Sequence, residues 1–290
     1  MAGLKKNINE LIQLNKEFYL QKKELRKSLN VHDELFFKNL PNKIFNDAEI
    51  IFVLSTGRCG TELLTKILNS SSGIQAYHNP PPELIYPSRI VYQKNQDAFE
   101  EIKMGVFMSR YDIVEKTYLR GKKYVETNCK ITFFAPQIKS LFKKAKFIHL
   151  IREPVGFVNS AIRRGYYQSE SADRGHIFPK DRVMKEKWHK MSLVEKITWN
   201  WLETNNYIES FKKTLDEEDY ITIYSSDLFS KIETSKKIIN FCKGQIPNDK
   251  KLSKIIKVKY NKSRKNKKKK LLDQDKILIK KLTSGLYEIY

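Results

Sequence analysis

The stretch IIFVLSTGRCGTELLTKIL, residues 50–68, decides the fold of this chain. A run of apolar and β-branched residues ends near Ser55, and a short loop with two glycines leads at once into a helical pattern. A strand, a glycine-bearing turn and a helix N-terminus bring backbone N–H groups together around an anion. The residues therefore predict a phosphate-binding loop. The nucleoside triphosphate pattern G-x-x-x-x-G-K-[ST] is not met, because no lysine precedes Thr61 and the cation of the loop is Arg58.

The composition is that of a folded protein without a membrane span. A chain of 290 residues with 40% hydrophobic residues is long and apolar enough for one large α/β domain. No apolar run approaches the length of a transmembrane helix, and the N-terminus lacks the apolar core of a signal peptide. The three cysteines, Cys59, Cys129 and Cys242, are too far apart to indicate a disulfide framework. These features predict a cytoplasmic protein.

The formal net charge of +22 points to an anionic partner without choosing one. A nucleic acid, a membrane surface contacted peripherally, a nucleotide and an acidic glycan all fit such a charge. Lysine is also far more frequent than arginine, and Asn and Ile are abundant, which is what a biased genome produces. Lysines on solvated faces need no partner, so charge alone does not identify the ligand.

The order of elements predicts a parallel α/β sheet with helices on both faces. Residues 1–46 are predicted to form a basic, helical N-terminal extension, and residues 47–290 one α/β domain with a basic C-terminal segment. From residue 50 onward strands alternate with helices. Strands are expected at 50–55, 74–78, 122–127, 146–151 and 220–224, and helices at 61–70, 97–118, 136–144, 154–164, 192–214 and about 272–288. The long segment 165–190 has no clear period and is predicted to be a binding loop.

A second strand-turn-helix unit lies in KFIHLIREPVGFVNSAIRRGYY, residues 146–167. Its helix is expected to begin near Pro154, since proline is favoured in the first helical turn. Ser160 and Arg164 then lie one turn apart on the open face, and Arg152 precedes the helix. A hydroxyl and two guanidinium groups suit a phosphate. Two anion sites at the carboxyl ends of parallel strands imply a ligand with two separated phosphate groups.

These two motifs resemble those of one enzyme family. STGRCGTELL, residues 55–64, is similar to the 5′-phosphosulfate-binding loop of sulfotransferases, and REPVGFVNSAIRR, residues 152–164, to their 3′-phosphate motif R-x-P-x-x-x-x-x-S-x-x-x-R. The similarity continues in YVETN, FKKAKFIHLIR, IYSSDLF and IINFCKG, all within residues 50–245. The chain thus resembles soluble bacterial-type sulfotransferases, which use 3′-phosphoadenosine 5′-phosphosulfate (PAPS). The resemblance implies a P-loop-type α/β fold and transfer of a sulfuryl group to a hydroxyl or amine.

The resemblance also implies roles for individual residues. Arg58 matches the loop cation, often a lysine, that neutralises the leaving phosphate. Arg152 and Ser160 match the ligands of the 3′-phosphate, and Tyr224 matches a tyrosine near the nucleotide. The 5′-phosphate is assigned to the loop residues Thr56, Gly57, Arg58, Cys59, Gly60, Thr61 and Glu62. For Glu62 the alternative is a carboxylate that complements the helix dipole. A basic C-terminal loop covers the 3′-phosphate in the family; here Lys262, Ser263 and Arg264 either do this or belong to a solvated lysine run.

The acceptor needs a base, because a hydroxyl or amine is a weak nucleophile until its proton leaves. The family uses His or Glu, and this sequence offers Glu126, His78 and Glu83 near the ends of predicted strands. The alternative for Glu126 is a structural pairing with Arg58 or an amide. Cys59, at a helix N-terminus, is either a thiol of lowered pKa or a small residue that fits beside a phosphate.

The acceptor is the least constrained part of the prediction. Segment 165–190 is charged and aromatic, which favours a saccharide or glycoconjugate hydroxyl; the alternative is a solvent-facing lid. Aromatic residues expected to flank the cleft are Tyr77, Tyr86, Tyr92, Tyr166, Tyr167, Phe178 and Trp188. No metal is predicted, because the histidines and cysteines form no ligand set. Two rival classes are a P-loop nucleotide kinase, which the missing lysine disfavours, and a basic nucleic-acid-binding protein, which leaves the two phosphate sites unexplained.

Overall fold

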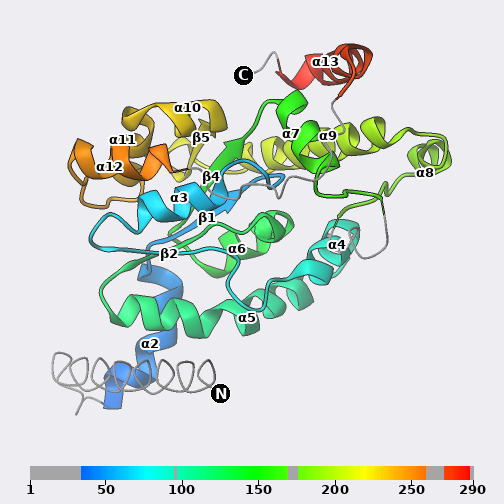
Figure 1. Ribbon diagram of the computed structural model, residues 1–290. Helices are drawn as coiled ribbons and strands as arrows, with labels where there is room; N and C mark the ends of the chain where they lie inside the picture. Colours follow the sequence, from blue (N-terminus) through cyan, green and yellow to red (C-terminus); the bar gives the residue numbers. More distant parts are fainter. Residues whose placement is uncertain (1–33, 95–96, 169–175, 259–270, 288–290) are drawn as a thin grey trace, which may run out of the picture.

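The apolar run of residues 50–54 forms β1, the middle strand of a parallel five-stranded sheet in the computed structural model, which describes residues 34–94, 97–168, 176–258 and 271–287. The strand order is β2-β3-β1-β4-β5. Figure 1 shows the sheet in the middle of the molecule with helices around it. The strands are β1 Ile50–Leu54, β2 Ile74–Tyr77, β3 Lys123–Glu126, β4 Ala145–Ile151 and β5 Tyr220–Tyr224. All five predicted strands are confirmed, each end to within one residue.

Side chains along β1 alternate between two cores, and this alternation places helices on both faces of the sheet. Ile50 and Phe52 pack in one core with residues of α2, α5 and α6, whereas Ile51 and Val53 pack in another with residues of α3, α11 and α12. A third cluster joins α7, α9 and α13 (Figure 1). The α-helices are α2 Glu34–Asp47, α3 Thr61–Leu68, α4 Ile85–Lys94, α5 Phe99–Leu119, α6 Ala135–Leu141, α7 Pro154–Ile162, α8 Arg182–Trp188, α9 Leu193–Lys212, α10 Ser225–Ser230, α11 Ile232–Phe241, α12 Asp249–Lys257 and α13 Asp273–Tyr287.

Two short helices correct the sequence prediction. Helix α8 forms inside segment 165–190, where no helix was expected, and the Asp181 side chain caps it by accepting from the Met184 amide at 2.7 Å. Helix α4 follows the turn after β2. Its Pro87 lies in the first turn, where a missing N–H breaks no helical hydrogen bond.

The helical segments at the two ends pack on the main body where they are described. Leu40 and Ile44 of α2 are buried against α5. Ile279 of α13 is buried in the cluster with α7 and α9. Residues 1–33 of the predicted extension and the proposed loop Lys262, Ser263 and Arg264 lie outside the described residues. Among the residues that the structure describes, no helix is long and apolar enough to cross a membrane.

Candidate active site

The loop between β1 and α3 has the backbone of an anion cradle. Gly57, Arg58 and Gly60 all adopt left-handed conformations, with φ of 75°, 58° and 96°. A Cβ at Gly60 would lie 2.6 Å from the ring of Phe229, and one at Gly57 would lie 3.1 Å from the Cys129 sulfur, so both positions require glycine. Gly60, the residue at the N-cap position of α3, has no side chain that could cap the helix. The first-turn N–H groups there suit an anionic ligand in place of a cap.

Three arginines meet beside this loop. The Arg58 Nε donates to the Ser160 Oγ at 3.2 Å, and the Arg152 Nη1 donates to the Arg58 carbonyl oxygen at 2.8 Å. Burial lowers the pKa of Arg58, and the positive charges of Arg164 and Arg152 lower it further. None of these arginines forms an ion pair with a carboxylate of the described chain. Concentrated positive charge without an internal counter-ion is the electrostatic signature of an anion site.

Two buried side chains, Trp201 and Ser225, hold this arrangement in place. Trp201 lies on α9, and its indole N–H donates to the Arg152 carbonyl oxygen at 2.9 Å. The Ser225 hydroxyl lies 2.7 Å from the Cys59 carbonyl oxygen and 3.1 Å from that of Ile151, so it links the phosphate loop to the end of β4. Tyr224, the last residue of β5, packs half-buried against the cluster that contains α7.

Cys59 is a structural residue of the loop. Its side chain is fully buried, and the thiol donates to the Gly57 carbonyl oxygen at 3.0 Å. The Thr56 hydroxyl lies 3.4 Å from the same sulfur. Burial raises the pKa of Cys59 to about 11, which contradicts the alternative of a reactive thiol. Thr61 and Glu62 occupy the first turn of α3, where Glu62 also complements the helix dipole.

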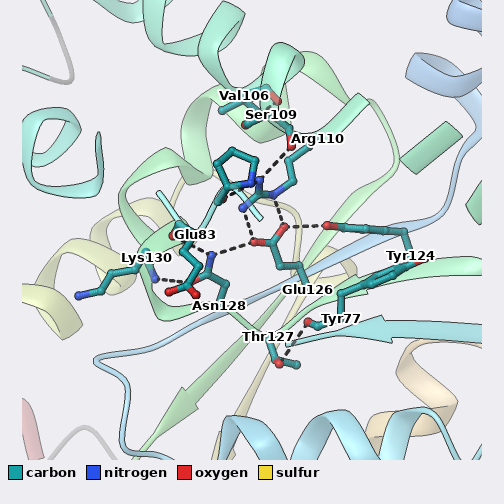
Figure 2. A network of polar contacts seen from close by, with 11 residues as sticks. Tyr77, Glu83, Val106, Ser109, Arg110, Tyr124, Glu126, Thr127, Asn128 and Lys130 are labelled. Atoms are coloured by element: carbon teal, nitrogen blue, oxygen red, sulfur yellow. Dashed lines mark hydrogen bonds and ion pairs between the residues drawn. The ribbon is translucent and has the colours of Figure 1, made fainter. Parts of the chain in front are cut away.

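Glu126 has a different position from that expected of a base (Figure 2). Its side chain is fully buried, and the Arg110 guanidinium binds both carboxylate oxygens, at 2.7 and 2.9 Å. The Tyr124 hydroxyl and the Asn128 amide donate to the same oxygens at 2.8 and 3.1 Å. Four donors and complete burial leave this carboxylate no route to an acceptor proton. The structure thus favours the structural alternative for Glu126, with Arg110 rather than Arg58 as its partner.

The Glu126 network also fixes the turn that carries the other two base candidates. Arg110 donates to the Pro82 carbonyl oxygen at 3.1 Å, and Asn128 donates to that of Glu83 at 3.3 Å. The Glu83 side chain itself is exposed. His78, directly after β2, is half-buried, and its Nδ1 lies 2.9 Å from the Thr127 carbonyl oxygen. The turn thus presents His78 at the carboxyl edge of the sheet, the edge that also carries the phosphate loop.

The aromatic residues of segment 165–190 pack against one another. Tyr167 lies 5.5 Å from Phe178 and 5.2 Å from Trp188, centroid to centroid, and Trp188 is buried. The Tyr167 hydroxyl donates to the Ile177 carbonyl oxygen at 2.7 Å. Tyr166, Tyr167 and Phe178 are half-buried, and Tyr86 on α4 is 56% exposed. That these rings flank an acceptor cleft stays a prediction.

The fold can now be compared with solved structures. A sulfotransferase from Alicyclobacillus acidocaldarius superposes with a TM-score of 0.50 at 15% identity, covering 81% of this chain and 91% of that one. The sulfotransferase domain of the Synechococcus PCC 7002 olefin synthase gives a TM-score of 0.46 at 16% identity, covering 81% and 94%. The sulfotransferase domain from the curacin biosynthetic pathway gives 0.46 at 18% identity, covering 73% and 79%. No protein-family profile and no curated protein sequence matches the chain.

The class of fold follows from the first of these superpositions. The chain has the parallel α/β fold of bacterial sulfotransferases, as the sequence predicted. The low identity limits this result to the fold. In the described part of the chain, no three His, Cys, Asp or Glu side chains come together in a way that suits a metal ion.

Proposed function

We propose that this protein transfers a sulfuryl group from PAPS to a hydroxyl-bearing acceptor. The observation that carries the proposal is the convergence of Arg58 and Arg152 with Ser160 at the ends of two adjacent parallel strands, without a carboxylate partner among the described residues. A donor with a phosphate group at each end of its ribose matches two such anion sites. A fold shared with sulfotransferases supports the same assignment.

Each group of the site has a distinct task in this reaction. The phosphate-loop amides and Arg58 bind the 5′-phosphate and stabilise the charge that develops as its bond to sulfur breaks. Arg152 and Ser160 bind the 3′-phosphate and so set the position of the donor. As the acceptor oxygen bonds to sulfur, its proton passes to the Nε2 of His78. We choose His78 over Glu126 because the Glu126 carboxylate is already saturated.

The acceptor that we propose is a saccharide or glycoconjugate hydroxyl. Its support is the polar composition of segment 165–190; the buried aromatic cluster adds none. Incubation with ³⁵S-labelled PAPS and panels of glycans and phenols tests the class of acceptor. Label on the glycans is expected. Label on the phenols alone would overturn the saccharide assignment and leave sulfuryl transfer standing.

The donor assignment has a test that needs no acceptor. Adenosine 3′,5′-bisphosphate, the product of the donor, should stabilise the protein by roughly 3 kcal/mol at 100-fold its Kd, measured as a thermal shift. AMP should stabilise it less, because the 3′-phosphate site stays empty. Arg58→Ala should lose most of the shift, whereas Arg182→Ala, on the exposed face of α8, should keep it.

The same screen separates the rival functions. Equal shifts with AMP and the bisphosphate would rule out a 3′-phosphate site. A larger shift with ATP would favour a kinase. A response to oligonucleotides alone, reduced by salt, would favour a nucleic-acid-binding protein.

A further inference from the structure

A chain of hydrogen bonds connects His78 to the phosphate loop. The Nδ1 of His78 lies 2.9 Å from the Thr127 carbonyl oxygen and 3.0 Å from the Thr127 hydroxyl. That hydroxyl lies 2.6 Å from the hydroxyl of Thr65, which donates to the Thr61 carbonyl oxygen at 2.9 Å. Thr61 is the first residue of α3 and the last of the loop. The contacts thus run from the candidate base to the candidate donor site.

The protons in this chain can each be placed. Thr65 gives its only hydroxyl proton to the Thr61 carbonyl, so in its contact with Thr127 it must accept. Thr127 therefore donates to Thr65 at 2.6 Å, and the Tyr77 carbonyl oxygen is a more distant acceptor of the same proton at 3.4 Å. With either acceptor, the hydroxyl has no second proton to offer His78. The Thr127 carbonyl can only accept as well. Both partners of the His78 Nδ1 are acceptors, so Nδ1 carries the hydrogen and the lone pair of the neutral ring lies on Nε2.

The two threonine hydroxyls are buried, so their hydrogen bonds depend on protein groups and not on water. Thr127 is 0% exposed and Thr65 is 6% exposed, so water has little access to replace either hydroxyl. The two residues come from β3's carboxyl end and from α3, while His78 follows β2. Three elements thus meet at the Thr127 hydroxyl, and a change at Thr61, in the first turn of α3, reaches His78 through three hydrogen bonds.

We propose that Thr127, held by Thr65, is a positioning residue that keeps His78 in the tautomer with a basic Nε2 and links it to the phosphate loop. The catalytic consequence rests on the proposed function. The tautomer itself is a property of the free protein. If the threonines served only to join β2, β3 and α3, their hydroxyls would affect stability and leave the histidine unchanged.

The variants that separate these roles are nearly isosteric. Thr127→Val removes the hydroxyl and keeps the shape, and Thr127→Ser restores the hydroxyl. Thr283→Val is the matched control, because Thr283 is equally buried but bonds only within its own helix α13. Thr65→Val breaks the same chain of hydrogen bonds at its other end. It replaces Thr127→Val in the test if that variant does not fold.

The first measurement is the tautomer of His78, read from long-range ¹⁵N–¹H correlations of histidine-labelled protein at about pH 8, where histidine is ordinarily neutral. His78→Gln identifies the signal. Wild type, Thr127→Ser and Thr283→Val should show the hydrogen on Nδ1. Thr127→Val should shift the population toward the Nε2–H form, because the Thr127 carbonyl alone then holds the ring. Thr65→Val should shift it the same way, because the Thr127 proton loses its acceptor on Thr65 and becomes free to be donated to Nδ1.

The second measurement is sulfuryl transfer on whichever acceptor the labelled panels identify. Thr127→Val should lower kcat by roughly 10-fold, the effect of losing one hydrogen bond, with the KM for PAPS nearly unchanged. Thr127→Ser should recover it. Hydrogen on Nε2 in the wild type, or a Thr127→Val protein with the wild-type tautomer, would overturn the proposal. A protein that shows the expected tautomers and yet transfers no sulfuryl group would refute the proposed function and leave the positioning role intact.

Discussion

At the scale of single residues, Arg58 shows how the loop differs from a nucleotide-triphosphate loop. A non-glycine residue at φ 58° carries a conformational cost of roughly 1–2 kcal/mol, and the fold keeps it there. This backbone turn directs the guanidinium toward Ser160 on α7, across two adjacent strands of the sheet. The strained position therefore brings one cation to both of the proposed anion sites.

Glu126 gives the sharpest prediction at this scale. Glu126→Gln preserves the shape of the side chain but leaves the fully buried Arg110 charge without its partner. We expect the free energy of unfolding to fall by about 3–5 kcal/mol in urea titrations. Glu186→Gln, which breaks an exposed Arg–Glu pair on α8, should cost less than about 1 kcal/mol.

The same variant separates the two roles of Glu126. If Glu126 is the base, its replacement by glutamine should abolish turnover and change stability little. If Glu126 is a structural carboxylate, the same replacement should lower stability, and the molecules that remain folded should keep their activity. Unchanged stability together with abolished transfer would return Glu126 to the position of base.

At the scale of elements, the sequence predicts best where one property is repeated along a segment. The strands were predicted correctly because buried parallel strands are continuous apolar runs, and β1 is buried at every position. Helix α8 was missed because seven residues are too few to show a helical period, and its only clear signal is the capping Asp181. Short helices are stabilised by their caps and their packing. Neither appears as a helical repeat of apolar residues in the sequence.

The candidate site was predictable in part for the same reason. Arg58, Arg152 and Ser160 lie at fixed offsets from strand ends, so the order of elements alone brings them together. Arg110 lacks such a signal, because it lies in the middle of a long helix at no fixed offset from a strand end, and only the folded chain shows it beside Glu126. Our preference for His78 over Glu126 as the base depends on that one partner.

At the scale of the whole molecule, His176 connects segment 165–190 to the pH dependence of stability. Its ring is 7% exposed and stacks on Tyr166 with centroids 3.9 Å apart. Burial, together with the nearby charge of Lys130, lowers the pKa of His176 to about 3. The unfolded chain takes up this proton near the ordinary histidine value of about 6.5. Between these two values the unfolded state binds more protons than the folded state, so the free energy of unfolding must fall as the pH falls.

His176→Phe should remove this dependence while keeping an aromatic ring against Tyr166. On acidification from about pH 6.5 to about pH 4.5, we expect the wild type to lose on the order of 2 kcal/mol more stability than the variant. Urea titrations at several pH values measure the difference, and His189→Gln, at an exposed position, should follow the wild type. Parallel curves for wild type and His176→Phe would mean that His176 is protonated in the folded protein. The stacking of Tyr166 and Tyr167 on the His176 ring would then have to open in acid.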